Sequence, residues 1–169
     1  MKIVPKLLFG LLMLLPLASS ANFISSTGDI TQRGAGSVSY MIFDQDARAR
    51  TNIAVNSGYF DTQIYLFEND GSLGASDYVA SNDDGGPGLN SLISRVLNAG
   101  SYILAVSDFH FSFSEALSGF NYNNRYGDYS VSINSRANVS FNSVPEPTTL
   151  SLLGLGLLGV RLSQRYRKS

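Results

Sequence analysis

The middle of the chain alternates apolar and polar residues with a period of two, which is the pattern of strands that bury one face. In the segment RTNIAVN, Ile53 and Val55 alternate with Asn52 and Asn56, and the segments GSVSYMIF and DYSVSIN repeat the alternation. The segment TQIYLF is apolar on both faces. Gly, Asn, Asp and Ser bound these segments at spacings of about ten residues. The pattern predicts one all-β domain, a single antiparallel β-sandwich, over residues 22–143.

The N-terminal end of the chain departs from this alternation. Two lysines precede an apolar run from Leu7 to Leu17, and small residues follow the run up to Ala21. A charged start, an apolar middle and a small-residue end, in this order, are typical of a secretory signal peptide. We therefore predict a signal helix over residues 1–21, which signal peptidase removes by cutting after Ala21, or alternatively after Ser20. A buried N-terminal helix is the alternative.

The C-terminal end carries a second apolar run, from Thr148 to Val160. It has 13 residues, whereas a helix needs about 20 to span the hydrocarbon core of a membrane. We predict a hydrophobic helix that is a marginal membrane anchor. The basic residues that follow it should keep its far end in the cytoplasm, because positive charge stays on that side; they are Arg161, Arg165, Arg167 and Lys168.

Charge is distributed unevenly along the chain. All 13 acidic residues, but six of the 12 basic ones, lie between residues 22 and 147, which gives this part a net charge of −7. An acidic surface repels phosphate backbones, so we expect no nucleic-acid partner. The chain has no cysteine. The hydrophobic core must therefore hold the exported domain together without disulfides.

The residues directly before the C-terminal run are Val144, Pro145, Glu146 and Pro147. This VPEP sequence, followed by a Leu/Gly-rich run and a basic end, resembles the PEP-CTERM sorting signal of exopolysaccharide-producing Gram-negative bacteria. The resemblance implies that an exosortase, a membrane transpeptidase, reads the motif while the inner membrane holds the protein transiently, and then delivers it to the cell surface or outside. The two prolines also favour an extended segment that an enzyme can grip. An uncut, permanent anchor is the alternative.

A second resemblance covers residues 61–109. Asp61, the Asp70-Gly71 turn, the NDDGG loop at 82–86 and the AGSY segment at 99–102 are similar to bacterial pre-peptidase C-terminal domains. The resemblance implies a jelly-roll-like β-sandwich that binds or assists rather than catalyses. Some of these domains bind calcium, and Asn82, Asp83 and Asp84 offer the oxygen ligands that calcium prefers. A solvated turn is the alternative. Asp61 and Asp108 could complete a calcium site if they lie at the same end.

The segment after Asp108 is rich in aromatic residues. We predict a loop here in which Phe109, Phe111 and Phe113 share one face, and we expect an aromatic plug that closes one end of the sandwich. Exposed rings that stack on sugars are the alternative. His110 is the one histidine, and Asp108 with His110 and a serine could form an esterase-like triad. Catalysis also needs an oxyanion hole and a pocket, which no motif indicates, so we expect no enzyme.

These features predict an exported, non-catalytic protein of the cell surface or extracellular matrix, associated with exopolysaccharide and biofilm. Its three parts are the signal peptide at residues 1–21, the sandwich at 22–143 and the sorting signal at 144–169. The alternative is a carbohydrate-binding or calcium-dependent adhesive module. The expected partners are signal peptidase, an exosortase-like transpeptidase, the inner membrane and extracellular polysaccharide.

Overall fold

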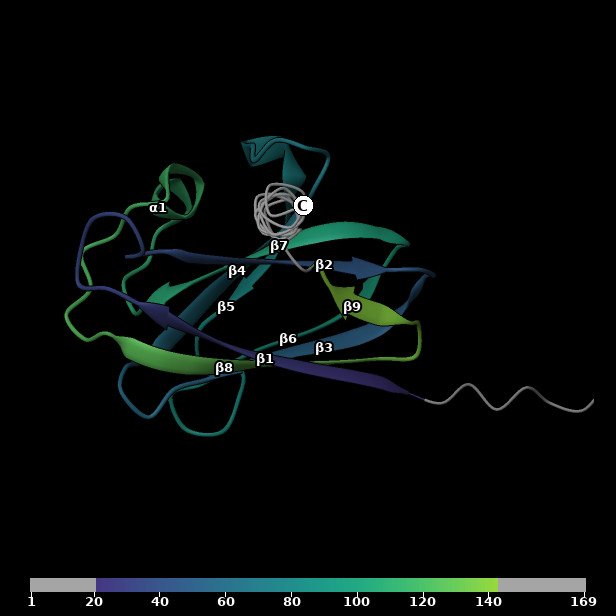
Figure 1. Cartoon of the computed structure of the whole chain (residues 1–169), viewed down its shortest axis with the longest axis horizontal. Coiled ribbons are helices and arrows are strands. Elements are labelled where there is room, and N and C mark those ends of the chain that lie inside the picture. Colours follow the sequence, from purple (N-terminus) through teal and green to yellow (C-terminus); the bar gives the residue numbers. More distant parts are fainter. Residues whose placement is uncertain (1–20, 143–169) are drawn as a thin grey trace, which may run out of the picture.

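The computed structural model describes residues 21–142, and within them nine strands form two antiparallel sheets (Figure 1). The four-stranded sheet has the order β1 (Asn22–Ile30), β8 (Gly127–Ser135), β3 (Ala49–Asn56) and β6 (Ser91–Leu97). The five-stranded sheet has the order β5 (Tyr78–Asn82), β4 (Thr62–Glu68), β7 (Gly100–Asp108), β2 (Ser39–Gln45) and β9 (Val139–Phe141). The predicted all-β, antiparallel sandwich is confirmed. Both expected flanking helices lie outside the described residues.

The main core fills the space between the two sheets. Strand register aligns Ile24, Ile133, Ile53 and Ile93 in one row across the four-stranded sheet. All four belong to the main hydrophobic cluster or pack against it. On each strand, the polar residues that alternate with the buried ones point away from the core, as Ser130 does on β8. The period-two pattern therefore encoded the buried face, because successive side chains on a strand point to opposite sides.

A second core covers the outer face of the five-stranded sheet. Ile64 and Leu66 of β4 point into the main core, whereas Tyr65 and Phe67 point outward into a separate buried cluster. Phe111 and the short helix α1 (Phe113–Ser118) close this cluster from outside. This second layer explains why TQIYLF is apolar on both faces. A short 3-10 helix, η1 (Ala75–Asp77), precedes β5.

The aromatic segment after β7 departs from the predicted arrangement, in which its three phenylalanines share one face. β7 ends at Asp108 and α1 begins at Phe113, so the three phenylalanines do not share a face. Phe111 is buried and Phe113 half-buried, whereas Phe109 is exposed. The rings thus cover a sheet face rather than close an end of the sandwich. A capping box starts α1: Ser112 Oγ accepts the Glu115 N–H, and the Glu115 carboxylate accepts the Ser112 N–H at 2.7 Å.

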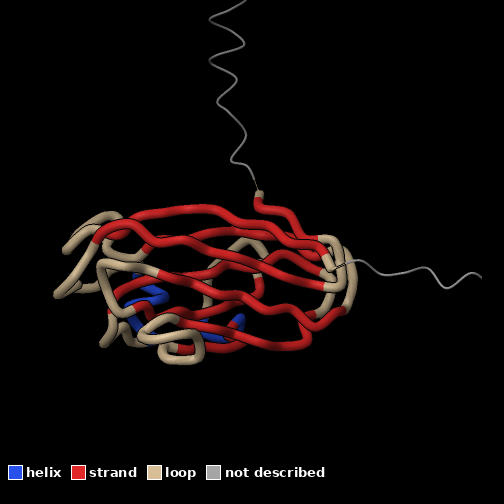
Figure 2. The backbone as a smooth tube through the Cα atoms, turned by 90° about the horizontal axis from the view of Figure 1, so that it is seen from below, coloured by secondary structure: helices blue, strands red, loops and turns tan. Residues whose placement is uncertain are grey.

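The two ends of the sandwich differ. Four loops, at residues 31–38, 57–61, 83–90 and 109–126, follow β1, β3, β5 and β7 and therefore meet at one end, which we call the long-loop end. The opposite end carries the other turns and Asn22, which pairs with the last residue of β8. Strands run lengthwise between the two sets of loops (Figure 2). No helix within residues 21–142 is long and apolar enough to cross a membrane.

Candidate functional site

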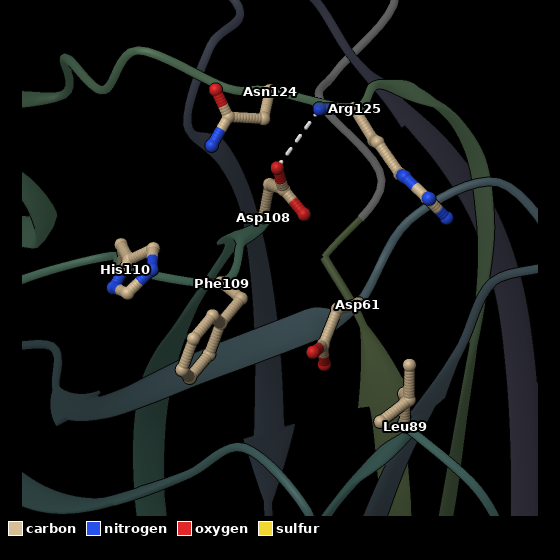
Figure 3. A pocket seen from close by; sticks show the side chains of 7 residues that line it. All are labelled: Asp61, Leu89, Asp108, Phe109, His110, Asn124 and Arg125. Carbon is tan, nitrogen blue, oxygen red and sulfur yellow. Dashed lines mark hydrogen bonds between the residues drawn. The ribbon is translucent and has the colours of Figure 1, made fainter.

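The long-loop end contains a shallow pocket of about 260 Å³ (Figure 3). Asp61 precedes β4 and Asp108 ends β7, and the register of these two neighbouring strands brings the two acids together. The N–H of Phe109 donates to the carbonyl of Asp61 at 2.9 Å, which fixes the two chains at this point. The residues that line the pocket are Asp61, Leu89, Asp108, Phe109, His110, Asn124 and Arg125.

Asp108 is almost fully buried, with 4% of its surface exposed. Its Oδ2 accepts the backbone N–H of Arg125 at 2.9 Å, and its own N–H donates to Asn123 Oδ1 at 3.4 Å. Figure 3 shows the other carboxylate oxygen turned toward the space between Asp61 and the Arg125 side chain.

Asp61 places a second acceptor in the same pocket. Its Oδ1 is buried and has no hydrogen-bond partner within the described part of the chain. Burial is the main cause that raises the pKa of the Asp61 carboxyl above its usual range, and the charges of Asp84, Asp108 and Asp83 raise it further. The expected condition is therefore met: Asp61 and Asp108 lie at the same end as the acidic loop.

The acidic loop itself is built as a turn. Asn82 Oδ1 accepts two backbone N–H groups, those of Gly85 and Leu92, both at 2.8 Å. Asp83 Oδ1 accepts the N–H of Asp84 at 2.9 Å. An amide oxygen with two donors has no lone pair left for a cation, so the Asn82 side chain does not fit a calcium ligand. Residues 21–142 hold no group of three or more His, Asp or Glu side chains placed to share a metal ion.

Chelation tests the hypothesis that Asn82, Asp83 and Asp84 bind calcium. Because Asn82 is already saturated by backbone donors, we expect thermal unfolding to be the same in EDTA and in calcium chloride. A calcium ion at 100 times its Kd would add about 2.7 kcal/mol of stability, which is easily measured. A lower Tm in EDTA, abolished by Asp84→Asn, would establish the calcium site.

His110 is not placed as the base of a triad. It has a φ of 72°, in the left-handed region, and its ring lies against Phe109 with centroids 4.2 Å apart. Figure 3 shows this ring directed away from the Asp108 carboxylate, which instead binds the Arg125 N–H. The structure therefore does not bring together the Asp108 and His110 side chains as the triad hypothesis required.

Further exposed aromatic residues lie on the loops of the long-loop end. Tyr59, two residues before Asp61, is 62% exposed. Tyr122 and Tyr126 on the loop 109–126 are also exposed, and the guanidinium of Arg33 lies 5.5 Å from the Tyr122 ring centroid. Sequence analysis had not singled out Tyr59. The sequence feature that could have indicated it is a tyrosine next to Gly58, in a short loop between two predicted strands.

Residues 143–168 match the family described as the PEP-CTERM protein-sorting motif. This chain carries a PEP-CTERM sorting signal. The match contains Val144 to Pro147 and the basic residues Arg161, Arg165, Arg167 and Lys168. The signal implies an exported protein that is anchored transiently at a membrane and processed there by an exosortase. These residues lie outside the described part of the structure, as do residues 1–20 of the signal peptide predicted over 1–21.

Two solved structures are similar to this chain. One is the pre-peptidase C-terminal domain of a collagenase from Bacillus anthracis, with 17% identity, a TM-score of 0.46, and 65% of this chain and 87% of that chain covered. The other is PliG from Aeromonas hydrophila, a periplasmic inhibitor of g-type lysozyme, with 12% identity, a TM-score of 0.47, and 72% and 92% covered. No curated protein matches the chain.

Proposed function

We propose that this is a non-catalytic protein that an exosortase delivers to the cell surface or the extracellular matrix, where it associates with exopolysaccharide. The sorting motif at residues 143–168 carries the proposal. The acidic sandwich before it supports a binding role, because its long-loop end presents exposed aromatic rings and carboxylates. The His110 ring is directed away from the Asp108 carboxylate, which supports a non-catalytic role.

The position of the motif relative to the domain supports processing close to the folded body. The last described residue, Asn142, donates its N–H to the carbonyl of Ile42 at 3.0 Å, next to β9. Val144 follows two residues later. An enzyme that reads VPEP therefore works directly beside the sandwich, and what remains after the cut is a folded domain with almost no tail.

Changing the motif tests the proposal. In a host with an exosortase, wild-type protein should lose the residues beyond the motif and leave the inner membrane. Pro145→Ala combined with Glu146→Ala should keep the C-terminal run and stay in the membrane fraction, because the enzyme no longer finds its motif. Intact mass and cell fractionation measure both outcomes.

A matched control changes the tail but not the motif. Ser163→Ala combined with Gln164→Ala lies between Arg161 and Arg165 and leaves the basic charges in place. This variant should be processed like wild type. An intact, uncut tail on wild-type protein at its final location would contradict the proposal and make the apolar run a permanent anchor.

A carbohydrate-binding module is the second candidate function. The observation that favours it is the group of exposed rings at the long-loop end, which includes Tyr59, Tyr122 and Tyr126. Tyrosine combines an apolar face with a polar tip and is suited to contact with a hydrated ligand. Co-sedimentation of the mature protein with the host polysaccharide, compared with Tyr59→Ala and with Tyr126→Ala, tests this function.

A further inference from the structure

One buried carboxylate oxygen in the pocket has no hydrogen-bond donor among the described residues. Asp61 Oδ1 is buried without a partner, and the second oxygen of the buried Asp108 faces the same space, within the part of the chain that the structure describes (Figure 3). Buried polar atoms are nearly always hydrogen-bonded, since leaving one unpaired costs free energy. An ionised carboxylate only accepts hydrogen bonds, so a group that completes this site must donate them.

Apolar surface lies next to these two acceptors. Leu89 and Phe109 line the pocket although they are 59% and 40% exposed. Large apolar side chains kept at the surface beside convergent polar groups are typical of a ligand site. A sugar ring has both matching features: a face of C–H groups that can pack on Phe109, and an edge of donors that can reach the carboxylates.

The negative charge of the pocket indicates which class of sugar it would bind. Asp61 and Asp108 line the pocket, and the charges of Asp83 and Asp84 also act on Asp61, whereas His110 and Arg125 are the basic groups of the lining. This surplus of negative charge repels uronic acids and attracts a protonated amine. An ammonium group also offers three donors where the site offers acceptors.

We propose that the pocket between Asp61, Asp108 and Phe109 binds an amino-sugar residue of an extracellular polysaccharide through its protonated amine. The inference rests on the proposed function, since it takes the polysaccharide of that function as the ligand. Asp61 and Asp108 accept hydrogen bonds from the amine and a neighbouring hydroxyl. Phe109 packs against the face of the sugar ring.

The site has a signature that a structural role lacks. The pKa of Asp61 is raised in the folded protein, so its charged form destabilises the fold, and this destabilisation disappears as the pH falls through the raised pKa. Asp61→Asn should therefore raise the Tm at pH 7 while it removes sugar binding. At a pH below the usual range of a carboxyl, the Tm of the variant and of wild type should converge.

Titration calorimetry at pH 7 with the mature protein purified from its host tests the proposal. The probes are oligomers of glucosamine, of N-acetylglucosamine and of a uronic acid. Glucosamine oligomers should bind at least tenfold more tightly than the acetylated ones, because acetylation removes the charge, and the uronates should not bind. Asp61→Asn and Phe109→Ala should each weaken glucosamine binding at least tenfold. Glu68→Gln, which removes the same charge at the opposite end of β4, should change nothing.

Three results would overturn the inference. Equal binding of the acetylated oligomers would exclude a role for the amine. Binding that Asp61→Asn leaves intact would place the sugar elsewhere. A Tm that rises with calcium chloride and falls with EDTA in wild type, but not in Asp61→Asn, would make the pocket a metal site. Failed sugar binding by a normally processed protein refutes this inference alone, whereas an uncut tail on a protein that binds sugar refutes the sorting proposal alone.

Discussion

Replacing Asn123 by alanine should destabilise the domain by about 3–4 kcal/mol, since it leaves several buried groups without partners. Asn123 is fully buried. Its Nδ2 donates to the carbonyls of Thr31 and Ser37 at 2.7 and 2.8 Å. Its Oδ1 accepts from Ser107 Oγ at 2.8 Å and from Asn121 Nδ2 at 2.9 Å. One side chain thus joins the loop 31–38, the end of β7 and the loop 109–126.

Urea unfolding of the variant measures this loss, and the adjacent residue supplies the control. Asn124 has the same chemistry but is exposed and lines the pocket. Asn124→Ala should change the free energy of unfolding by less than about 0.5 kcal/mol, as surface substitutions usually do. If the two variants lost stability equally, the buried hydrogen bonds of Asn123 would not be what stabilises the loop 109–126.

Phe111→Ala should cost about 3–5 kcal/mol, the range for a fully buried phenylalanine. Phe111 is 1% exposed and meets the Tyr65 ring edge-on, with centroids 5.2 Å apart. Its N–H donates to Gln63 Oε1 at 2.9 Å, and its carbonyl accepts the Tyr65 hydroxyl at 3.1 Å. Loss of the ring opens the outer core, so the loop 109–126 should also become sensitive to proteolysis.

Phe109 provides the matched comparison two residues away. It is 40% exposed and contributes little buried apolar area. Phe109→Ala should therefore leave the urea midpoint close to that of wild type, although the same change is expected to weaken glucosamine binding. A large loss of stability in Phe109→Ala, or none in Phe111→Ala, would contradict the assignment of Phe111 as the buried ring and Phe109 as the exposed one.

The strands that face the main core were predictable, because each buries one side and so imposes a period of two. Residues Tyr129, Val131 and Ile133 are an example: all three are buried, and Ser130 between them is exposed. The sequence of β1 shows no such alternation of apolar and polar residues. It pairs with β8 alone and is at most half-buried over most of its length, so its sequence can remain polar.

The plug at the end of the sandwich was the wrong prediction, because Phe111 and Phe113 pack on the outer face of a sheet, and the cause is local. The alternation FHFSFS indicates that the three phenylalanines share a face, but His110 takes a left-handed conformation and the Ser112–Glu115 capping box begins a helix. That S-x-x-E spacing was visible in the sequence and is a helix-start signal. The meeting of Asp61 with Asp108 could be expected only conditionally, because it depends on which strands become neighbours.

Strand β1 begins at Asn22, directly after the predicted cleavage site at Ala21, and Asn22 is already paired with Ser135. A peptide bond held in a ladder cannot lie extended in a protease at the same time, because both uses take the same backbone groups. Cutting after Ala21 must therefore come before the first residues of β1 pair, or during fraying of this edge. Removal of the signal peptide is therefore coupled to the pairing of the first residues of β1 with the end of β8.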